Sequence, residues 1–212
     1  MDDKPTLFYI ARHGETEFNA AGIMQGMSVD SPLTENGVRQ AQELGAKLKE
    51  IHFDHVFSSD LRRAHRTAEL ATIERNLAIN TSHLLRERSY GKYDGKDAEL
   101  YRKENAALFE KKNQLEYQEQ RNFRFAPDME TDDEAARRLV LFLRETAVTY
   151  PGKTILAVCH GGIIRQFLIH IGWGTPDELK GGVIKNAAYL KVETDGINIR
   201  VLETSGVEKA TQ

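Results

Sequence analysis

The sequence has little of the chemistry that builds disulfides and metal sites. Cys159 is the single cysteine among 212 residues, so no intramolecular disulfide and no cysteine-rich metal site can form. The seven histidines include no His-Glu-x-x-His motif and no Cys/His cluster. We therefore expect no disulfide framework, no metal site and no bound cofactor.

The sequence also lacks a large excess of positive or negative charge, and it lacks long hydrophobic runs. The chain carries 29 Lys and Arg against 32 Asp and Glu, a formal net charge of -3, which excludes a strongly basic nucleic-acid-binding surface. Residues 1–11 begin with Asp2 and Asp3 where a secretory signal would be basic, and their apolar run is too short to cross a bilayer. The sequence predicts a soluble, cytoplasmic protein with neither nucleic acid nor membrane as a partner.

What the chain has is an alternation of short apolar runs and amphipathic helices. Its length suits one domain over residues 1–212. Continuous apolar runs predict strands at residues 6–11, 55–59, 78–85 and 154–159. Helical patterns follow at residues 38–51, 60–72, 131–149 and 160–172, and Asp195-Gly196 predicts a hairpin within residues 187–203. This order is typical of an α/β fold with a largely parallel sheet.

Residues 96–128 differ from the rest of the chain. They are helix-prone and highly charged, with few large apolar side chains. We interpret them as a solvated insertion. A capping box formed by Thr131 and Glu134 predicts that the next core helix begins directly after this segment.

Two histidines follow two of the predicted strands. His13 comes after the first strand and precedes Gly14, and His160 follows the strand at 154–159 and precedes Gly161. Ligands of parallel sheets bind beyond the carboxyl ends of the strands. Neighbouring strands lie about 5 Å apart, so adjacent placement would let both imidazoles contact one small ligand.

The surrounding residues indicate an anionic ligand, and phosphate in particular. Arg12 can hold two oxygens through its planar guanidinium, and a helix that begins at Gly161 would direct free N–H groups at the same place. A third strand-to-helix junction, SSDLRRAHRTA, adds further cations. Candidates there for the same pocket are Arg62, Arg63 and Arg66.

These stretches also carry a family resemblance. The segments ARHGETEFN, QG…DSPLTENG, SSDLRRAHRTA, LRERSYGKYDG and CHGG occur in this order, and together they resemble the histidine phosphatase, or phosphoglycerate mutase-like, superfamily. The resemblance covers the chain outside residues 96–128. It implies a three-layer α/β/α sandwich of the phosphoglycerate mutase type, with a mostly parallel sheet and the insertion as a helical lid over the active site.

The resemblance implies a role for each matching residue. His13 matches the nucleophile that becomes a phosphohistidine, and Glu87 matches the general acid. The phosphate-binding positions are Arg12, Arg62 and His160. Positions that contact phosphate or substrate are Asn19, Gln25, Gly26, Tyr90 and Gly161. The expected activity is metal-independent hydrolysis of small phosphorylated metabolites through a phosphohistidine.

Two alternatives stay open at this point. One is a cofactor-dependent phosphoglycerate mutase or a bifunctional mutase and phosphatase, and the other is a phosphate-sensing or protein-interaction module. Ala98 occupies the position where the mutases carry a lysine, and only Arg121 and Arg124 could replace their paired arginines, which favours the phosphatase. Aromatic side chains could line the lid or merely pack it on the core: Tyr101, Phe109, Tyr117, Phe123 and Phe125.

Overall fold

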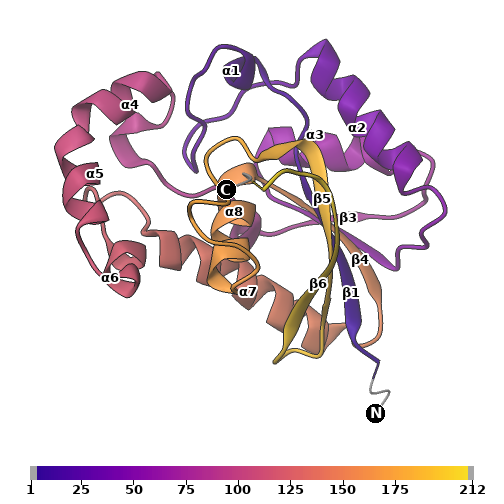
Figure 1. The fold of residues 1–212 in the computed structure, drawn as a ribbon. Coiled ribbons are helices and arrows are strands. Elements are labelled where there is room, and N and C mark those ends of the chain that lie inside the picture. The colour runs from indigo at the N-terminus through magenta and orange to yellow at the C-terminus, as the bar shows by residue number, and fades with distance from the viewer. Residues whose placement is uncertain (1–3, 210–212) are drawn as a thin grey trace.

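The computed structural model describes residues 4–209, so the acidic start at Asp2 and Asp3 and the last residues of the expected domain lie outside it. The described residues contain one six-stranded sheet of order β3-β2-β4-β1-β5-β6 (Figure 1). The strands are β1 (Thr6–Arg12), β2 (His55–Ser58), β3 (Ile79–Thr81), β4 (Thr154–Cys159), β5 (Ile184–Thr194) and β6 (Ile199–Val207). The first four run parallel, whereas β5 pairs antiparallel with both β1 and β6.

Helices cover both faces of this sheet. They are α1 (Glu17–Ala20), α2 (Glu35–Lys47), α3 (Arg62–Ala71), α4 (Ala98–Glu104), α5 (Ala106–Asn113), α6 (Tyr117–Asn122), α7 (Asp132–Thr149) and α8 (Gly161–His170). Alternate residues of β1 divide the core, because Phe8 and Ile10 pack with α7 and α8 while Tyr9 and Ala11 pack with α2 and α3. The three-layer sandwich expected from the sequence is confirmed.

Local signals in the sequence explain several element boundaries. The Thr34 side chain caps α2, and Thr131 and Glu134 form the expected capping box of α7. Asp195 turns the hairpin by accepting the N–H groups of Ile197 and Asn198. The strand predicted at 78–85 is shorter than expected, since the Ser82 hydroxyl accepts the N–H of Leu84 and a 3₁₀ turn, η1 (His83–Leu85), replaces its second half.

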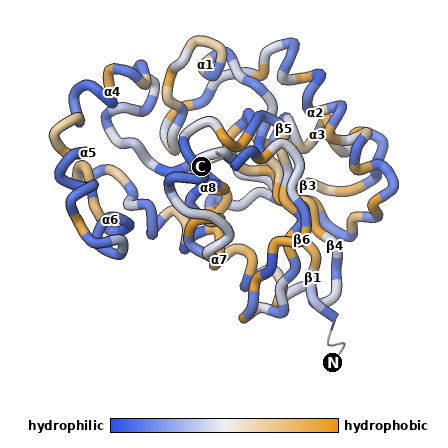
Figure 2. Tube along the Cα trace, in the orientation of Figure 1, coloured by the Kyte–Doolittle hydropathy of each residue, from blue (hydrophilic) through white to orange (hydrophobic). Residues whose placement is uncertain are grey.

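The predicted insertion forms the short helices α4, α5 and α6. Figure 1 shows them gathered at one end of the molecule, away from the strands. Figure 2 shows them mainly hydrophilic, in contrast to the apolar strands. Among residues 4–209, no helix is both long enough and apolar enough to cross a membrane.

Candidate active site

The two strand-end histidines meet. β1 and β4 are adjacent and parallel, with Arg12 opposite Cys159, and the next N–H, that of His13, donates to the Cys159 carbonyl at 3.0 Å. The rings of His13 and His160 are buried, with their centroids 5.2 Å apart. The two imidazoles therefore lie side by side at the carboxyl edge of the sheet, where His13, but not His160, lines a pocket.

The surroundings of His13 select one tautomer and one charge state. Its Nδ1 lies 2.7 Å from the Gly14 carbonyl oxygen, and because a carbonyl only accepts, Nδ1 carries the proton and Nε2 keeps its lone pair. Burial lowers the pKa of His13 well below the ordinary value, and the charges of Arg12 and Arg63 lower it further. The ring is therefore neutral near pH 7, as a nucleophile must be.

His160 is the N-cap residue of α8, and its ring is fully buried. Neither ring nitrogen has a hydrogen-bond partner among the described residues. Burial lowers the pKa of His160 well below its ordinary value, and the charges of Arg63 and His13 lower it further. Because unpaired buried polar groups are costly, this ring is suited to bonding an oxyanion that enters beside His13.

Arg12 lies under the start of α8. Its Nη1 donates to the Ile184 carbonyl at 2.6 Å, while its buried Nε lacks a partner within residues 4–209. A Cβ at position 161 would lie 3.0 Å from that Nε, a tight contact that glycine avoids. Burial lowers the pKa of Arg12, opposed by Glu87, but an arginine remains charged at any physiological pH.

The resemblance implied that Arg62 is the second phosphate-binding arginine, but Arg62 is exposed on α3 and does not line the pocket at the strand ends. Arg63 is buried and does not line this pocket either. Helical periodicity is the reason for the difference in burial. Arg63 shares the buried stripe of α3 with Thr67 four residues later, whose hydroxyl accepts the Gly14 N–H at 3.0 Å, while Arg62 shares the exposed face with Arg66.

Arg63 also organises the loop that precedes α2. Its guanidinium donates to the carbonyls of Gly26 and Val29 and pairs with Asp30 at 3.0 Å. The Asp30 carboxylate in turn accepts the N–H groups at the start of α3. Arg63 thereby brings a fixed positive charge to both histidines, which explains its effect on their pKa values.

Glu87 completes the group as a distant cap of α8. Its carboxylate accepts the N–H of Gly162 at 2.7 Å and that of Ile163 at 2.8 Å, in place of the side-chain cap that His160 does not provide. A Cβ at position 162 would lie 2.5 Å from the same carboxylate. The second glycine of CHGG therefore leaves room for the acid.

The remaining predicted positions are divided. Four of them line the pocket in front of the histidines: Asn19, Gln25, Tyr90 and Gly161. The Gln25 amide is bonded to Thr16 and Ser31, and burial raises the pKa of Tyr90. Gly26 does not line this pocket. Its backbone carbonyl supports Arg63.

The pocket has a volume of ≈ 620 Å³ and joins this site to the insertion. Four of the five predicted aromatics line it: Tyr101, Phe109, Tyr117 and Phe125. Phe123 instead packs edge-on against Phe125. Cations outnumber acids in the lining, with Arg12, Arg88, Arg102, Lys112, Arg121, Arg165 and Lys180 against Glu87 and Asp132.

The sequence profile of the histidine phosphatase superfamily (branch 1) matches residues 8–205. The chain belongs to this superfamily. It is 33% identical over 192 residues to the uncharacterized phosphatase PhoE of Bacillus subtilis, covering 89% of this chain and 88% of that protein. It is 30% identical over 212 residues to a 2,3-bisphosphoglycerate-dependent phosphoglycerate mutase of Streptococcus gordonii, covering 87% and 92%.

Solved structures of the superfamily share the fold. The phosphoglycerate mutase of Bacillus anthracis superposes with a TM-score of 0.81 at 29% identity, covering 97% of this chain and 95% of that one. The similarity to relatives named as phosphatases and to relatives named as mutases thus covers most of this chain in both cases. The family supports an enzyme with one of these two activities.

The positions that distinguish the mutases can be compared with the residues of this pocket. Ala98, at the position of the mutase lysine, lines it. Arg121 lines it too, but its guanidinium contacts the Asp132 carbonyl and Asp133. Arg124 is not in the lining and binds Met129 and Glu134. The two candidate arginines therefore point to different places and do not form a clamp.

Proposed function

We propose that this protein is a metal-independent phosphomonoester hydrolase that acts through a phosphohistidine on His13. Its main support is the neutral imidazole of His13, with Nε2 unprotonated, held beside two guanidiniums and a second imidazole. Arg12 and Arg63 would supply the positive charge that phosphoryl transfer requires around its equatorial oxygens, and the neutral His160 would donate a hydrogen bond to one of them.

In the first step, His13 Nε2 attacks phosphorus and the bond from phosphorus to the ester oxygen breaks. The leaving alkoxide needs a proton, which a protonated Glu87 would provide from the wall of the same pocket. Its hydrogen bonds from the first N–H groups of α8 keep the carboxyl beside the proposed phosphate-binding groups. The product of this step is the alcohol, with the phosphoryl group on His13.

In the second step, water attacks the phosphohistidine. The Glu87 carboxylate, left ionised by the first step, takes a proton from this water, and the bond from phosphorus to Nε2 breaks. Phosphate leaves, and His13 returns to its neutral form. Splitting the hydrolysis into two displacements is the advantage that covalent catalysis provides.

Small phosphorylated metabolites are the proposed substrate class. The pocket of ≈ 620 Å³ is large enough for such a molecule, and pockets of this size bury most of a small ligand. Residues 96–128 would act as the lid, because their aromatic and basic side chains form the wall opposite α8. Hydrolysis is preferred to the mutase reaction because Ala98 and the separated Arg121 and Arg124 offer no clamp for a retained glycerate.

The test is hydrolysis of p-nitrophenyl phosphate in EDTA at mildly acidic pH, combined with trapping of the phosphoenzyme from a ³²P-labelled substrate. We expect turnover, and an acid-labile, alkali-stable label that His13→Ala abolishes. His52→Ala is a matched control, since His52 is exposed on a loop. Full activity of His13→Ala, or activity that requires added metal, would contradict the proposal. Isomerisation of 3-phosphoglycerate faster than its hydrolysis would favour the mutase.

A further inference from the structure

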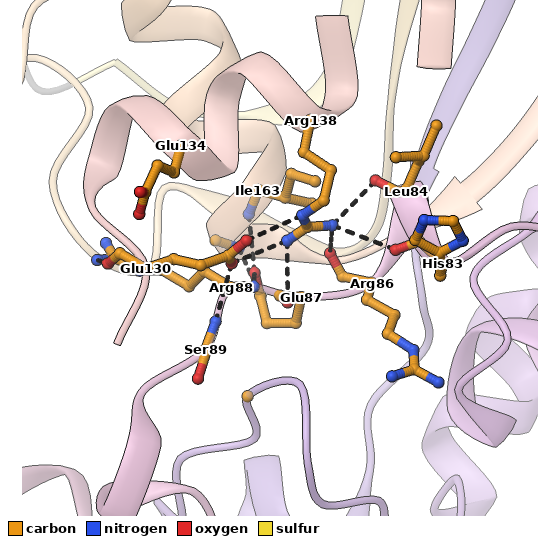
Figure 3. Close-up of polar contacts among 12 residues, drawn as sticks. His83, Leu84, Arg86, Glu87, Arg88, Ser89, Glu130, Glu134, Arg138 and Ile163 are labelled. Carbon is orange, nitrogen blue, oxygen red and sulfur yellow. Dashed lines mark hydrogen bonds and ion pairs between the residues drawn. The ribbon is translucent and has the colours of Figure 1, made fainter. Parts of the chain in front are cut away.

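The segment that carries Glu87 leaves η1 and reaches the insertion without joining a strand or α-helix of the core. Its backbone carbonyls are held by the side chain of Arg138, which extends from the middle of α7 toward the turn (Figure 3). Nη1 of Arg138 donates to the Leu84 carbonyl at 2.9 Å and to the Arg86 carbonyl at 2.7 Å. Nη2 donates to the carbonyl of Glu87 itself at 3.2 Å.

Glu130 binds the backbone on the C-terminal side of Glu87. One of its carboxylate oxygens accepts Nε of Arg138 at 3.0 Å. The other accepts both Nη2 of Arg138 at 2.9 Å and the backbone N–H of Ser89 at 3.0 Å. The ion pair therefore fixes the chain before and after Glu87. Both side chains are mostly shielded from water, with exposed fractions of 12% for Arg138 and 20% for Glu130.

Glu87 is thus held at two levels. Its carboxylate is fixed by the N–H groups of Gly162 and Ile163 on α8, while its backbone is fixed by Arg138 on α7. Because α7 and α8 pack against each other in one apolar core, both supports belong to one rigid unit. Shifting the backbone would pull the carboxyl away from the pocket even with the α8 helix intact.

We infer that Arg138 and Glu130 are positioning residues that set the place of the Glu87 carboxyl in the reaction. This inference rests on the proposed role of Glu87 as general acid. An error of about 1 Å in the place of a catalytic group can cost about 10²-fold in rate. The loss should fall on the step that needs the proton and not on phosphate binding, because neither side chain lines the pocket.

The experiment compares two substrates with Arg138→Gln. Ethyl phosphate has a poor leaving group that needs a proton, whereas p-nitrophenolate leaves without one. We expect kcat/KM for ethyl phosphate to fall about 30- to 100-fold and kcat/KM for p-nitrophenyl phosphate to fall less than about fivefold, because kcat/KM reports only the steps up to phosphoryl transfer to His13. Hydrolysis of the phosphohistidine is common to both substrates and does not enter this comparison. The ratio of the two kcat/KM values does not depend on how much of the sample is folded, so instability cannot imitate the effect.

Matched variants make the result specific. Arg137→Gln removes the neighbouring arginine of α7, which is 68% exposed and pairs with Asp133, and it should leave the ratio unchanged. Arg138→Lys keeps the charge but not the set of carbonyl contacts, and it should restore the ratio only in part. If Arg138→Gln does not fold, Glu130→Gln decides the question by the same ratio, since it keeps the side-chain volume and weakens the grip on Ser89.

Glu87→Ala separates the two levels of the inference. If it changes the ratio of kcat/KM values and Arg138→Gln does not, the positioning role is wrong while the proposed function stands. Should Glu87→Ala lower kcat/KM equally for both substrates, the acid role fails and the positioning role fails with it. A ratio that shifts in both variants, in the same direction and less in Arg138→Gln, supports both.

Discussion

The strand-end site and the insertion are built in opposite ways. His13, Arg63, Glu87 and His160 are all less than a tenth exposed, and the first three are held by hydrogen bonds to backbone groups. In the insertion, α4 and α5 contain no buried residue, and α6 contains only Arg121. One region is a fixed polar cluster inside the core, and the other is a set of short exposed helices that offers side chains to the same pocket.

The insertion joins the rest of the molecule through contacts beside the strand-end site. Tyr101 of α4 packs edge-on against Tyr90 of the pocket and against Phe109 of α5. Lys112 pairs with Asp132 at the start of α7. The insertion can therefore change its pocket-facing side chains with little effect on the strand ends. The comparison indicates that the reaction belongs to the core and the choice of substrate to the insertion, and the following predictions test that division.

The largest effect should come from the arginine that the structure selects. Arg63→Gln removes a buried charge beside both histidines, and we expect kcat/KM for p-nitrophenyl phosphate to fall about 10²- to 10³-fold, as for other preorganised donors at a transition state. Arg62→Gln should stay within about twofold, because a surface charge of this kind contributes little. Steady-state kinetics on the two variants, with circular dichroism to confirm folding, measure the difference.

Arg63→Lys separates charge from geometry. It keeps a cation near His13 but cannot bind Gly26, Val29 and Asp30 together. An intermediate loss is expected. If Arg62→Gln were the more damaging variant, the exposed arginine would have to turn inward during catalysis, and the division between a fixed core and a variable surface would be wrong.

The second effect concerns pH. Because His13 and His160 are held neutral with lowered pKa values, the unfolded chain binds more protons than the folded one below pH 6.5. The stability contributed is complete above that pH and is lost as the pH falls. Each histidine can cost up to about 1.4 kcal/mol per pH unit, so we expect the unfolding free energy to fall by about 2 kcal/mol from pH 6.5 to 5.5.

Urea unfolding at these two pH values tests this expectation, with the double variant His13→Gln/His160→Asn as the comparison. The carboxylates with lowered pKa values, such as Asp54 and Asp60, lose their contribution only at more acidic pH. If the unfolding free energy of the double variant falls as much as that of the wild type, the two histidines are not the cause of the pH dependence.

The third effect tests whether Gly162 is needed to leave room for the Glu87 carboxylate. In Gly162→Ala the new Cβ would meet the Glu87 carboxylate at 2.5 Å, and the displaced acid should lower kcat/KM for ethyl phosphate about 10- to 30-fold. Gly181 also lines the pocket, but a Cβ there has no neighbour within 4 Å. Gly181→Ala should therefore retain activity within about twofold. Equal losses in both variants would indicate that glycine flexibility, and not room for Glu87, is what matters.

These residues also show what the sequence can predict. The strand ends, the cap at Thr131 and the meeting of His13 with His160 follow from local patterns and from the parallel sheet. The choice between Arg62 and Arg63 was open to the same reasoning. Arg63 continues a stripe of small residues at helical spacing, and Arg62 continues a charged one.

Other features have no local signal. Asp30 caps α3 from a loop more than thirty residues earlier in the chain, and Arg138 binds carbonyls about fifty residues before it. Such contacts depend on how helices pack in three dimensions, which spacing along the chain does not specify. For the same reason, the sequence named aromatic candidates for the lid but could not separate Phe123 from the four that line the pocket.

The smallest effect should come from the insertion. Tyr101→Ala removes an aromatic ring that lines the pocket, and we expect KM for phosphorylated metabolites with an extended organic group to rise about 5- to 10-fold, equivalent to about 1 kcal/mol. The kcat for p-nitrophenyl phosphate should change less than about twofold. Leu100→Ala is the matched control, because Leu100 is the preceding residue of α4, is exposed and does not line the pocket.

A loss of kcat for p-nitrophenyl phosphate in Tyr101→Ala, with KM unchanged, would contradict the division of roles. Tyr101 touches the core through Tyr90, so such a loss would mean that the insertion helps to hold the reacting groups in place. The opposite pattern, a KM effect confined to larger substrates, would follow from geometry alone. The proposed phosphate-binding groups are anchored on β1, β4, α3 and α8, and none of these elements depends on Tyr101 for its place.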